Sequence, residues 1–194
     1  MRGIFLDTET NGLNFFIHKV LEIAFKIVDL STGDVLDQYS TIIKHPLNIW
    51  ELSDPDSLEV NGFTYEMMMQ GILPAKASLE ITQLLQKNRI HRDNAVFICQ
   101  NPSFDRVFFS QLIDPSIQEN FKWPYYWLDM ASMYWTLAIQ AGAFNAAQLP
   151  WKTGFSKNKI AAVYHLPPEE NPHRAMNGVD HLLLCYQKVV GFSA

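Results

Sequence analysis

The sequence predicts an α/β domain with one mixed sheet, and three observations support that fold class. Three extended segments open the chain in the pattern of an antiparallel meander. Segments with helical spacing of apolar residues follow, and a short apolar strand lies among them. The 194 residues are enough to bury one sizeable core. We therefore expect a single domain over residues 1–194, with helices flanking a three-strand antiparallel meander plus parallel strands.

The strands are predicted from apolar runs and from alternation. The first is an apolar run near the N-terminus, and Asn11-Gly12 marks a turn or loop after it. The second alternates between two sets of side chains, which is typical of a strand, and a turn at 31–34 separates it from the third. The expected strands cover 3–7, 20–28, 38–43 and 95–99.

Helices are expected where apolar residues recur every three or four positions. Ser156 is expected to cap one of them, because a serine side chain accepts hydrogen bonds from the first backbone amides of a helix. Scattered Pro, Asp and Asn over 46–74 predict irregular structure with a short helix at most. The expected helices cover 77–86, 104–113, 130–141, a segment with Ile160 and Tyr164, and a last segment from Leu182 to Val190.

Composition limits the classes of function. Apolar residues make up 48% and charged residues 18%, which suits a soluble globular protein. No apolar run approaches the roughly 20 residues that span a bilayer, and MRGIFLDTE lacks the pattern of a signal peptide. Cys99 and Cys185 do not make a disulfide framework, so a reducing cytoplasm is expected. The net charge of -5 argues against a strongly basic nucleic-acid binder, but it allows an enzyme that meets phosphates through metal ions.

Two acids stand at the end of the first expected strand. Asp7 and Glu9 are two positions apart, and such positions on a strand face the same side. Two carboxylates on one side can share one or two hard divalent cations such as Mg²⁺ or Mn²⁺. The other interpretation is a pair of solvated acids at a strand end.

Two further candidates follow in the chain. Asp105 comes after the strand at 95–99, in a loop position where α/β sheets often carry active-site residues. The alternative is an acid favoured at a helix start by the macrodipole. His173 precedes the last helix and is followed by Asp180, so it is a candidate general base, or else a loop histidine without a role.

Three segments resemble the signature segments of the DEDD exonuclease superfamily in its His-containing (DEDDh) branch: FLDTETNGL, NPSFD and HRAM…D. That branch includes exonuclease I, ribonuclease T, oligoribonuclease and the proofreading exonuclease subunit of the bacterial replicative polymerase. The segments stand in the family's order and span residues 4–187. LEIAF, VNGFT and WLDMASMYW, which contains Asp129, also match. The resemblance implies a ribonuclease-H-like fold and a 3′–5′ exonuclease.

The resemblance also implies a mechanism. Two Mg²⁺ or Mn²⁺ ions about 4 Å apart would be held in the site. Asp7 and Glu9 would bind them, with Glu9 also counted as catalytic, and Asp105 would ligate the second ion. His173 would take a proton from the attacking water, which releases a 5′-mononucleotide from a 3′ end. Thr10 of the first segment and Asn101 of the second are expected to contact the substrate.

The third segment departs from the family pattern, which places an aspartate five residues after the histidine. Gly178 stands there, and Asp180 lies two positions further on. Two positions along a helix rotate a side chain by about 200°, so Asp180 cannot replace position 178 on an unchanged helix. Either Asn177-Gly178 forms a turn and Asp180 becomes the fourth metal ligand, or that ligand is missing. The turn is the prediction here, because Asn-Gly favours one.

Substrate and partners remain open between alternatives. The motifs do not separate DNA from RNA, and an oligoribonuclease-like activity is the alternative among enzymes. A catalytically weakened nucleic-acid-binding module, attached to a polymerase or repair partner, is the alternative from another class. No membrane is expected as a partner, and exposed aromatic residues permit a homodimer. The residues that would stack on unpaired bases, or else belong to the core, are Phe15, Phe16, Trp50 and Phe63.

Overall fold

The computed structural model describes residues 1–141 and 149–192. Five strands form one sheet in the order β3-β2-β1-β4-β5. The first three strands pair antiparallel, whereas β4 pairs parallel with β1 and β5 pairs parallel with β4. This confirms the expected mixed sheet of a meander plus parallel strands. The strands are β1 (Arg2–Thr10), β2 (Val20–Asp29), β3 (Val35–Ile42), β4 (Ala95–Cys99) and β5 (Trp127–Asp129).

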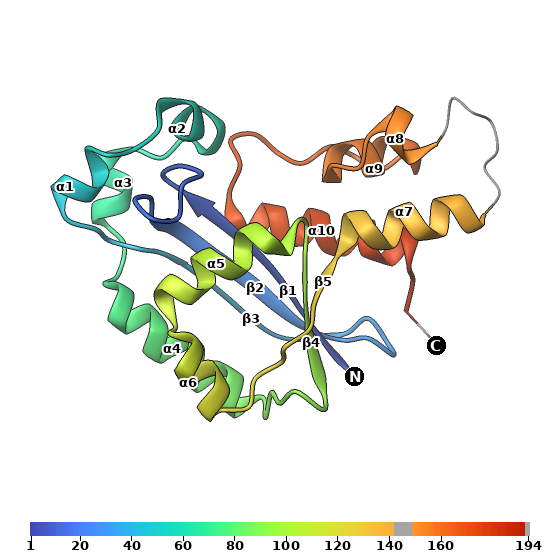
Figure 1. The fold of residues 1–194 in the computed structure, drawn as a ribbon, viewed down its shortest axis with the longest axis horizontal. Helices are drawn as coiled ribbons and strands as arrows, with labels where there is room; N and C mark the ends of the chain where they lie inside the picture. The colour runs from blue at the N-terminus through green and yellow to red at the C-terminus, as the bar shows by residue number, and fades with distance from the viewer. Residues whose placement is uncertain (142–148, 193–194) are drawn as a thin grey trace.

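Helices cover both faces of the sheet (Figure 1). The helices of the described residues are α1 (Leu47–Trp50), α2 (Pro55–Asn61), α3 (Tyr65–Met69), α4 (Pro74–Lys87), α5 (Pro102–Leu112), α6 (Pro115–Asn120), α7 (Met130–Gln140), α8 (Pro150–Thr153), α9 (Lys157–Val163) and α10 (Ala175–Val189). None of them is long and apolar enough to span a membrane.

The central strand β1 is buried on both faces, because each face is covered by helices. Ile4 and Leu6 pack into a core with residues of α4 and α5. Phe5 points to the opposite face and packs with residues of α7, α9 and α10. Figure 1 shows α4 and α5 on one side of the sheet and α7, α9 and α10 on the other. The same alternation decides which helices each later side chain of β1 meets.

Most expected elements are present with shifted bounds. The strand expected at 3–7 runs on to Thr10, so both acids of the first segment lie within β1. Ser156 caps α9 by accepting a hydrogen bond from the Lys159 amide at 3.4 Å, as predicted. Cys99 and Cys185 are buried free thiols. The region 46–74 holds three short helices rather than one, and β5, α6 and α8 were not anticipated.

The predicted turn at Asn177-Gly178 is wrong. Helix α10 begins at Ala175 and continues through both residues without a break. The Gly178 amide donates to the Arg174 carbonyl at 2.9 Å, which is a regular bond of the first helical turn. Position 178 therefore keeps the orientation of an uninterrupted helix, and Asp180 lies about 200° further round the axis.

Candidate active site

The first acids lie on the face of β1 that α10 covers. Asp7 and Glu9 share the face of Phe5, as their spacing predicts. The side chain of Asp7 is 13% exposed, and Glu9 is buried. Glu9 also stands opposite Glu22 of β2 in the strand register, so a third carboxylate belongs to the same face.

Asp105 reaches the same edge from the other face of the sheet. Strands β1 and β4 are parallel, so their carboxyl ends meet at one edge, and α5 begins just after β4. Thr8, which points to the α5 side, donates a hydrogen bond from its hydroxyl to the Asp105 carboxylate at 2.8 Å. These contacts bring Asp105 to the carboxyl end of β1, near Asp7, and its side chain is buried there.

The connection from β4 to α5 is shaped by Asn101. Its φ of 59° lies in the left-handed region, which asparagine tolerates better than most residues. The Asn101 amide donates to Asp129, whose carboxylate also caps α7 through the Ala131 and Ser132 amides. Ser103 donates to the Asn101 side chain at 2.6 Å. Asp129 thus has a structural role, and Asn101 presents an exposed side chain beside the site.

Burial shifts the pKa values of the three acids upward. Burial, followed by repulsion from Asp7, raises the pKa of Glu9 from 4.5 to about 8. Burial also raises the pKa of Asp7, although Lys157 opposes the shift, and it raises the pKa of Asp105 well above its usual range with repulsion from Asp7 as the next cause. A nearby cation would relieve this repulsion, so the arrangement is suited to binding one.

Helix α10 is fixed against the sheet by an ion pair with β2. Glu22 accepts two hydrogen bonds from the Arg174 guanidinium, at 2.9 and 2.7 Å, and one from the Ala175 amide at 2.9 Å. Paired hydrogen bonds of this kind set orientation as well as distance. The result is that Gly178 faces Asp7 so closely that a Cβ on residue 178 would stand 2.1 Å from the Asp7 Oδ2 atom.

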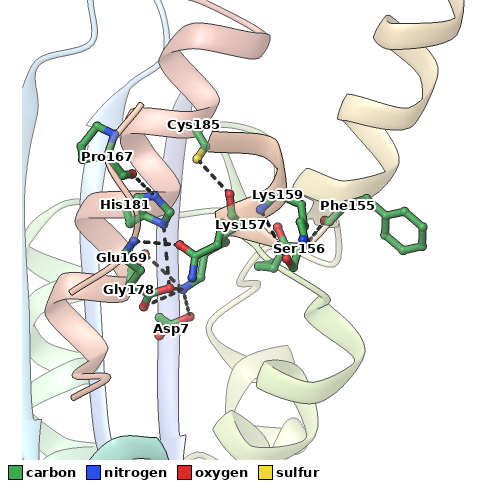
Figure 2. A network of polar contacts seen from close by, with 12 residues as sticks. Asp7, Phe155, Ser156, Lys157, Lys159, Pro167, Glu169, Gly178, His181 and Cys185 are labelled. Atoms are coloured by element: carbon green, nitrogen blue, oxygen red, sulfur yellow. Dashed lines mark hydrogen bonds and ion pairs between the residues drawn. The ribbon is translucent and has the colours of Figure 1, made fainter. Parts of the chain in front are cut away.

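A lysine that the sequence did not single out enters this site. Lys157, the first residue of α9, directs its side chain between β1 and α10 (Figure 2). Its Nζ atom lies 3.2 Å from Asp7 Oδ1, 3.2 Å from Glu169 Oε1 and 3.4 Å from the Gly178 carbonyl oxygen. Burial alone would lower the pKa of Lys157, but attraction to Asp7 and Glu169 outweighs burial and raises it.

Glu169 is the second residue that sequence reasoning missed. It is buried in the segment before α10, where its amide donates to the Asn158 side chain at 2.8 Å. One of its carboxylate oxygens lies 3.8 Å from Nδ1 of His181, whose Nε2 contacts the Pro167 carbonyl at 3.0 Å. These contacts hold the Glu169 carboxylate toward Lys157, as Figure 2 shows.

The structure does not bring Asp180 to the other acids. Its carboxylate forms an ion pair with Lys26 of β2, and its side chain is 51% exposed. The expectation of a fourth acid from α10 beside Asp7 is thus not met, because α10 is uninterrupted and presents Gly178 there instead.

His173 lies at the side of the site that α2 borders. Its amide donates to the Val60 carbonyl at 3.1 Å, which ties the segment before α10 to α2. The residue lines a hollow of about 670 Å³ together with Asp56, Glu59 and Val60. A positive charge on His173 lowers the pKa of Asp7, so the two side chains are electrostatic neighbours.

A groove of about 310 Å³ opens beside the acids, and Thr8, Glu9 and Thr10 contribute to its wall. The Thr10 hydroxyl donates to the Gly12 carbonyl at 2.8 Å, so its oxygen remains an acceptor. Of the aromatic candidates, Phe63 is buried, whereas Phe16 is 80% exposed. The groove is completed by Leu13, Asp54, Asp56, Ser57, Val60, Asn61 and Phe104.

The donor set fits one divalent cation better than two. Within residues 1–141 and 149–192, no three His, Cys, Asp or Glu side chains come close enough together to surround a metal ion. Magnesium, however, is commonly held by one or two carboxylates, with waters and substrate phosphates completing its shell. Glu9 with Asp7 or Asp105 can meet that need, and a cation would relieve the repulsion that Asp7 exerts on Glu9 and Asp105. The side of Asp7 that faces Gly178 does not fit, because the Lys157 ammonium already binds there.

No protein-family model and no curated protein matches the sequence. Solved structures match it across nearly its whole length. E. coli exonuclease I with a dT13 oligonucleotide aligns at 17% identity and a TM-score of 0.73, covering 97% of this chain and 41% of that chain. Its zinc-bound complex with single-stranded DNA aligns at 16% identity and a TM-score of 0.74, covering 97% and 40%. Exonuclease I from Methylocaldum szegediense aligns at 15% identity and a TM-score of 0.72, covering 96% and 40%.

The chain thus spans about two fifths of the length of these solved chains. The five-strand mixed sheet with its flanking helices is the feature in which they agree. The chain therefore has the fold of the part of exonuclease I that it matches, as the resemblance of its three signature segments predicts.

Proposed function

We propose that this chain is a nuclease that degrades single-stranded nucleic acid from its 3′ end and releases 5′-mononucleotides with the help of a divalent cation. The observation that carries the proposal is the set of buried acids at the carboxyl end of β1, beside an open groove. Burial raises the pKa values of Asp7, Glu9 and Asp105, and repulsion from Asp7 adds to the shifts of Glu9 and Asp105. Groups with strongly perturbed pKa values in a groove are favoured candidates for catalysis.

In this proposal the acids and His173 have separate tasks. Glu9, with Asp7 or Asp105, holds Mg²⁺ or Mn²⁺, which when bound stabilises negative charge on the phosphate and lowers the pKa of a bound water. His173, at the α2 side of the site, accepts the proton of the attacking water. Thr10 and Asn101 contact the terminal nucleotide from the two sides of the β1 edge.

Single-stranded DNA is the first substrate to test. Two of the similar structures are complexes of exonuclease I with single-stranded DNA or an oligonucleotide, which supports this choice. RNA and short oligoribonucleotides are the alternatives. The net charge of -5 favours contacts to only a few nucleotides at the strand end, because long strands are bound mainly by basic residues.

A gel assay tests the proposal directly. Oligomers of DNA and RNA with the same sequence and a 5′ fluorescent label are incubated with Mn²⁺, Mg²⁺ or a chelator. We expect stepwise shortening from the 3′ end with metal only, and 5′-mononucleotides as the chromatographic product. Glu9→Gln should reduce the rate by more than about 100-fold, because even residues outside the ligand shell typically cost about 10–100-fold.

The matched control is Glu51→Gln, which changes an exposed glutamate in the same way and should keep full activity. The proposal fails if the wild-type chain leaves both labelled oligomers intact with either metal. It also fails if Glu9→Gln degrades them at the wild-type rate.

One observation favours a second candidate, a nuclease-fold module that binds strand ends with little hydrolysis. The pairing of Lys157 with Asp7, opposite a helix that offers glycine instead of an acid, removes ligands that a metal could use. Fluorescence anisotropy with a labelled oligomer separates the candidates. Tight binding in the chelator, combined with intact oligomers in Mn²⁺, would support the module attached to a polymerase or repair partner.

A further inference from the structure

The Lys157 ammonium group is surrounded by oxygen atoms. Two belong to the carboxylates of Asp7 and Glu169, and one is the carbonyl oxygen of Gly178. A lysine ammonium has three N–H donors, so these acceptors can use all of them. No N–H is then left over for a phosphate oxygen. The lysine therefore serves the acids around it rather than a substrate.

The surroundings of this ammonium resemble a cation site in their chemistry. Carboxylate and carbonyl oxygens are the ligands that Mg²⁺, Mn²⁺ and Ca²⁺ prefer. The Lys157 side chain is 12% exposed and that of Glu169 is 2% exposed, so water cannot replace the charge that Lys157 supplies. Without a cation here, the buried carboxylates of Asp7 and Glu169 would repel each other. Repulsion from Glu169 accordingly raises the pKa of Asp7.

Gly178 makes room for this arrangement. A Cβ on residue 178 would stand 2.9 Å from Lys157 Nζ and 2.1 Å from Asp7 Oδ2. No larger side chain at position 178 can therefore coexist with the present positions of Lys157 and Asp7. Lysine at 157 and glycine at 178 are complementary choices, since one fills the space that the other leaves empty.

We propose that Lys157 is a built-in cation, whose ammonium fills a cation position between Asp7, Glu169 and the Gly178 carbonyl and so keeps divalent ions out of it. This inference rests on the metal site of the proposed function and narrows it. Divalent binding is confined to the Glu9 and Asp105 side, and the chain takes at most one such ion. Lys157 is a positioning residue, because it acts by holding Asp7 and Glu169 in place.

Removing the ammonium should turn the position into a metal site. Lys157→Met keeps a side chain of similar length without charge, and it leaves the two carboxylates and the carbonyl facing one another. Counting bound Mn²⁺ by electron paramagnetic resonance on the full chain at one pH measures the outcome. We expect at most one Mn²⁺ per chain in the wild type and one more in Lys157→Met. Lys159→Met, which alters an exposed lysine of the same helix, should match the wild type.

Two results would overturn the inference. A wild-type chain that binds two Mn²⁺ ions would mean that Lys157 moves aside and that Glu169 serves as the missing ligand. Equal Mn²⁺ counts in the wild type and Lys157→Met would mean that no cation position is vacated. The wild-type count does not depend on any variant folding, so the test stands even if Lys157→Met is unstable.

The inference on Lys157 and the proposed function can be contradicted independently of each other. A chain that binds one ion and hydrolyses nothing contradicts the proposed function but leaves the role of Lys157 intact. The melting temperature gives a second measure. Lys157→Met should melt lower than the wild type in chelator, and it should gain more than the wild type from saturating Mn²⁺, because only the variant has a vacated position.

Discussion

Asp7 shows what residue spacing can and cannot predict. Its position two residues before Glu9 placed both on one face of β1, and the structure has them so. Its partner Lys157, in contrast, lies 150 positions away, and nothing in the pattern of either segment connects them. A signal did exist, because lysine is unfavourable at the positive N-terminal end of a helix, and α9 begins at Lys157. A lysine at a helix N-terminus therefore indicates that its charge has a favourable partner elsewhere in the fold.

The His173 side chain belongs to the residue scale as well. As a general base it should contribute about 10²–10⁴-fold to the hydrolysis rate. His173→Ala is therefore expected to lower the rate of the hydrolysis step by that factor and leave the Mn²⁺ affinity nearly unchanged. Single-turnover cleavage of a labelled oligomer, with metal titrated in parallel, gives both quantities.

His91→Ala is the control for that experiment, since His91 lies in the loop that precedes β4, at the opposite end of that strand from Asp105, and its Nδ1 atom lies 3.1 Å from an Asp93 carboxylate oxygen. Hydrolysis by His173→Ala at the wild-type rate would show that the histidine is structural. A loss of Mn²⁺ affinity equal to the loss of rate would instead make it part of the metal site.

At the scale of elements, α10 explains why the predicted turn at Asn177-Gly178 does not form. Its existence and its apolar face were predictable from periodicity, but its first turn was not. The Asn-Gly pair favours a turn locally. That preference is outweighed because Glu22 binds both the Arg174 guanidinium and the Ala175 amide, which fixes the helix start before Asn177. A hydrogen-bonded ion pair between segments more than 150 residues apart leaves no trace in a local pattern.

Two substitutions on α10 should therefore change the stability of the fold by very different amounts. Gly178→Ala would normally favour a helix by about 0.5–1 kcal/mol. Here we expect it to destabilise the fold by about 1–3 kcal/mol, because its Cβ would stand 2.1 Å from Asp7 Oδ2 and overpack the site. Asp180→Asn should destabilise the fold by at most about 1 kcal/mol, since the Asp180 side chain is 51% exposed, although that of its partner Lys26 is only 16% exposed.

Urea unfolding of both variants in chelator measures these differences, and the same variants report on activity. Asp180→Asn should hydrolyse at the wild-type rate if Asp180 is no metal ligand. If Gly178→Ala is as stable as the wild type, Asp7 and Lys157 can shift without cost to make room for the Cβ atom. If Asp180→Asn loses most of its hydrolysis rate, Asp180 is again a candidate metal ligand.

For the whole molecule, the sheet and its coverage were largely predictable, whereas the site was predictable only in part. Alternation and apolar runs report burial directly, so the meander and β4 were found within a few residues. The short strand β5 was missed because three residues carry too little pattern. The site depends on the spacing between α9, α10 and β1, and packing across the whole fold sets that spacing. The roles of Gly178 and Lys157 are visible only in the folded structure, where these elements bring both residues next to Asp7.

The buried acids also predict how the stability of the whole domain depends on pH without metal. The pKa of Glu9 is raised by folding from 4.5 to about 8, so the folded state binds this proton more tightly than the unfolded state. Its contribution to stability is complete below about pH 4.5 and is lost as the pH rises toward 8. The raised pKa values of Asp7 and Asp105 act in the same direction.

Histidines oppose this trend only at lower pH. Burial lowers the pKa of His45 and His181 from 6.5, so their contribution grows as the pH rises to about that value and then stays constant. Between pH 7 and 8.5 we therefore expect the melting temperature in chelator to fall by several degrees, at about 2–4 °C for each kcal/mol in a domain of this size.

Glu9→Gln should remove most of that fall, because glutamine does not titrate, whereas Glu51→Gln should retain it. Saturating Mn²⁺ should also flatten the curve, since a bound cation stabilises the ionised carboxylates that high pH produces. Scanning calorimetry at half-unit steps of pH measures all four curves. A wild-type melting temperature that rises from pH 7 to 8.5 in chelator would show that the acids at the end of β1 are already neutralised, and the need for a divalent cation would disappear with their repulsion.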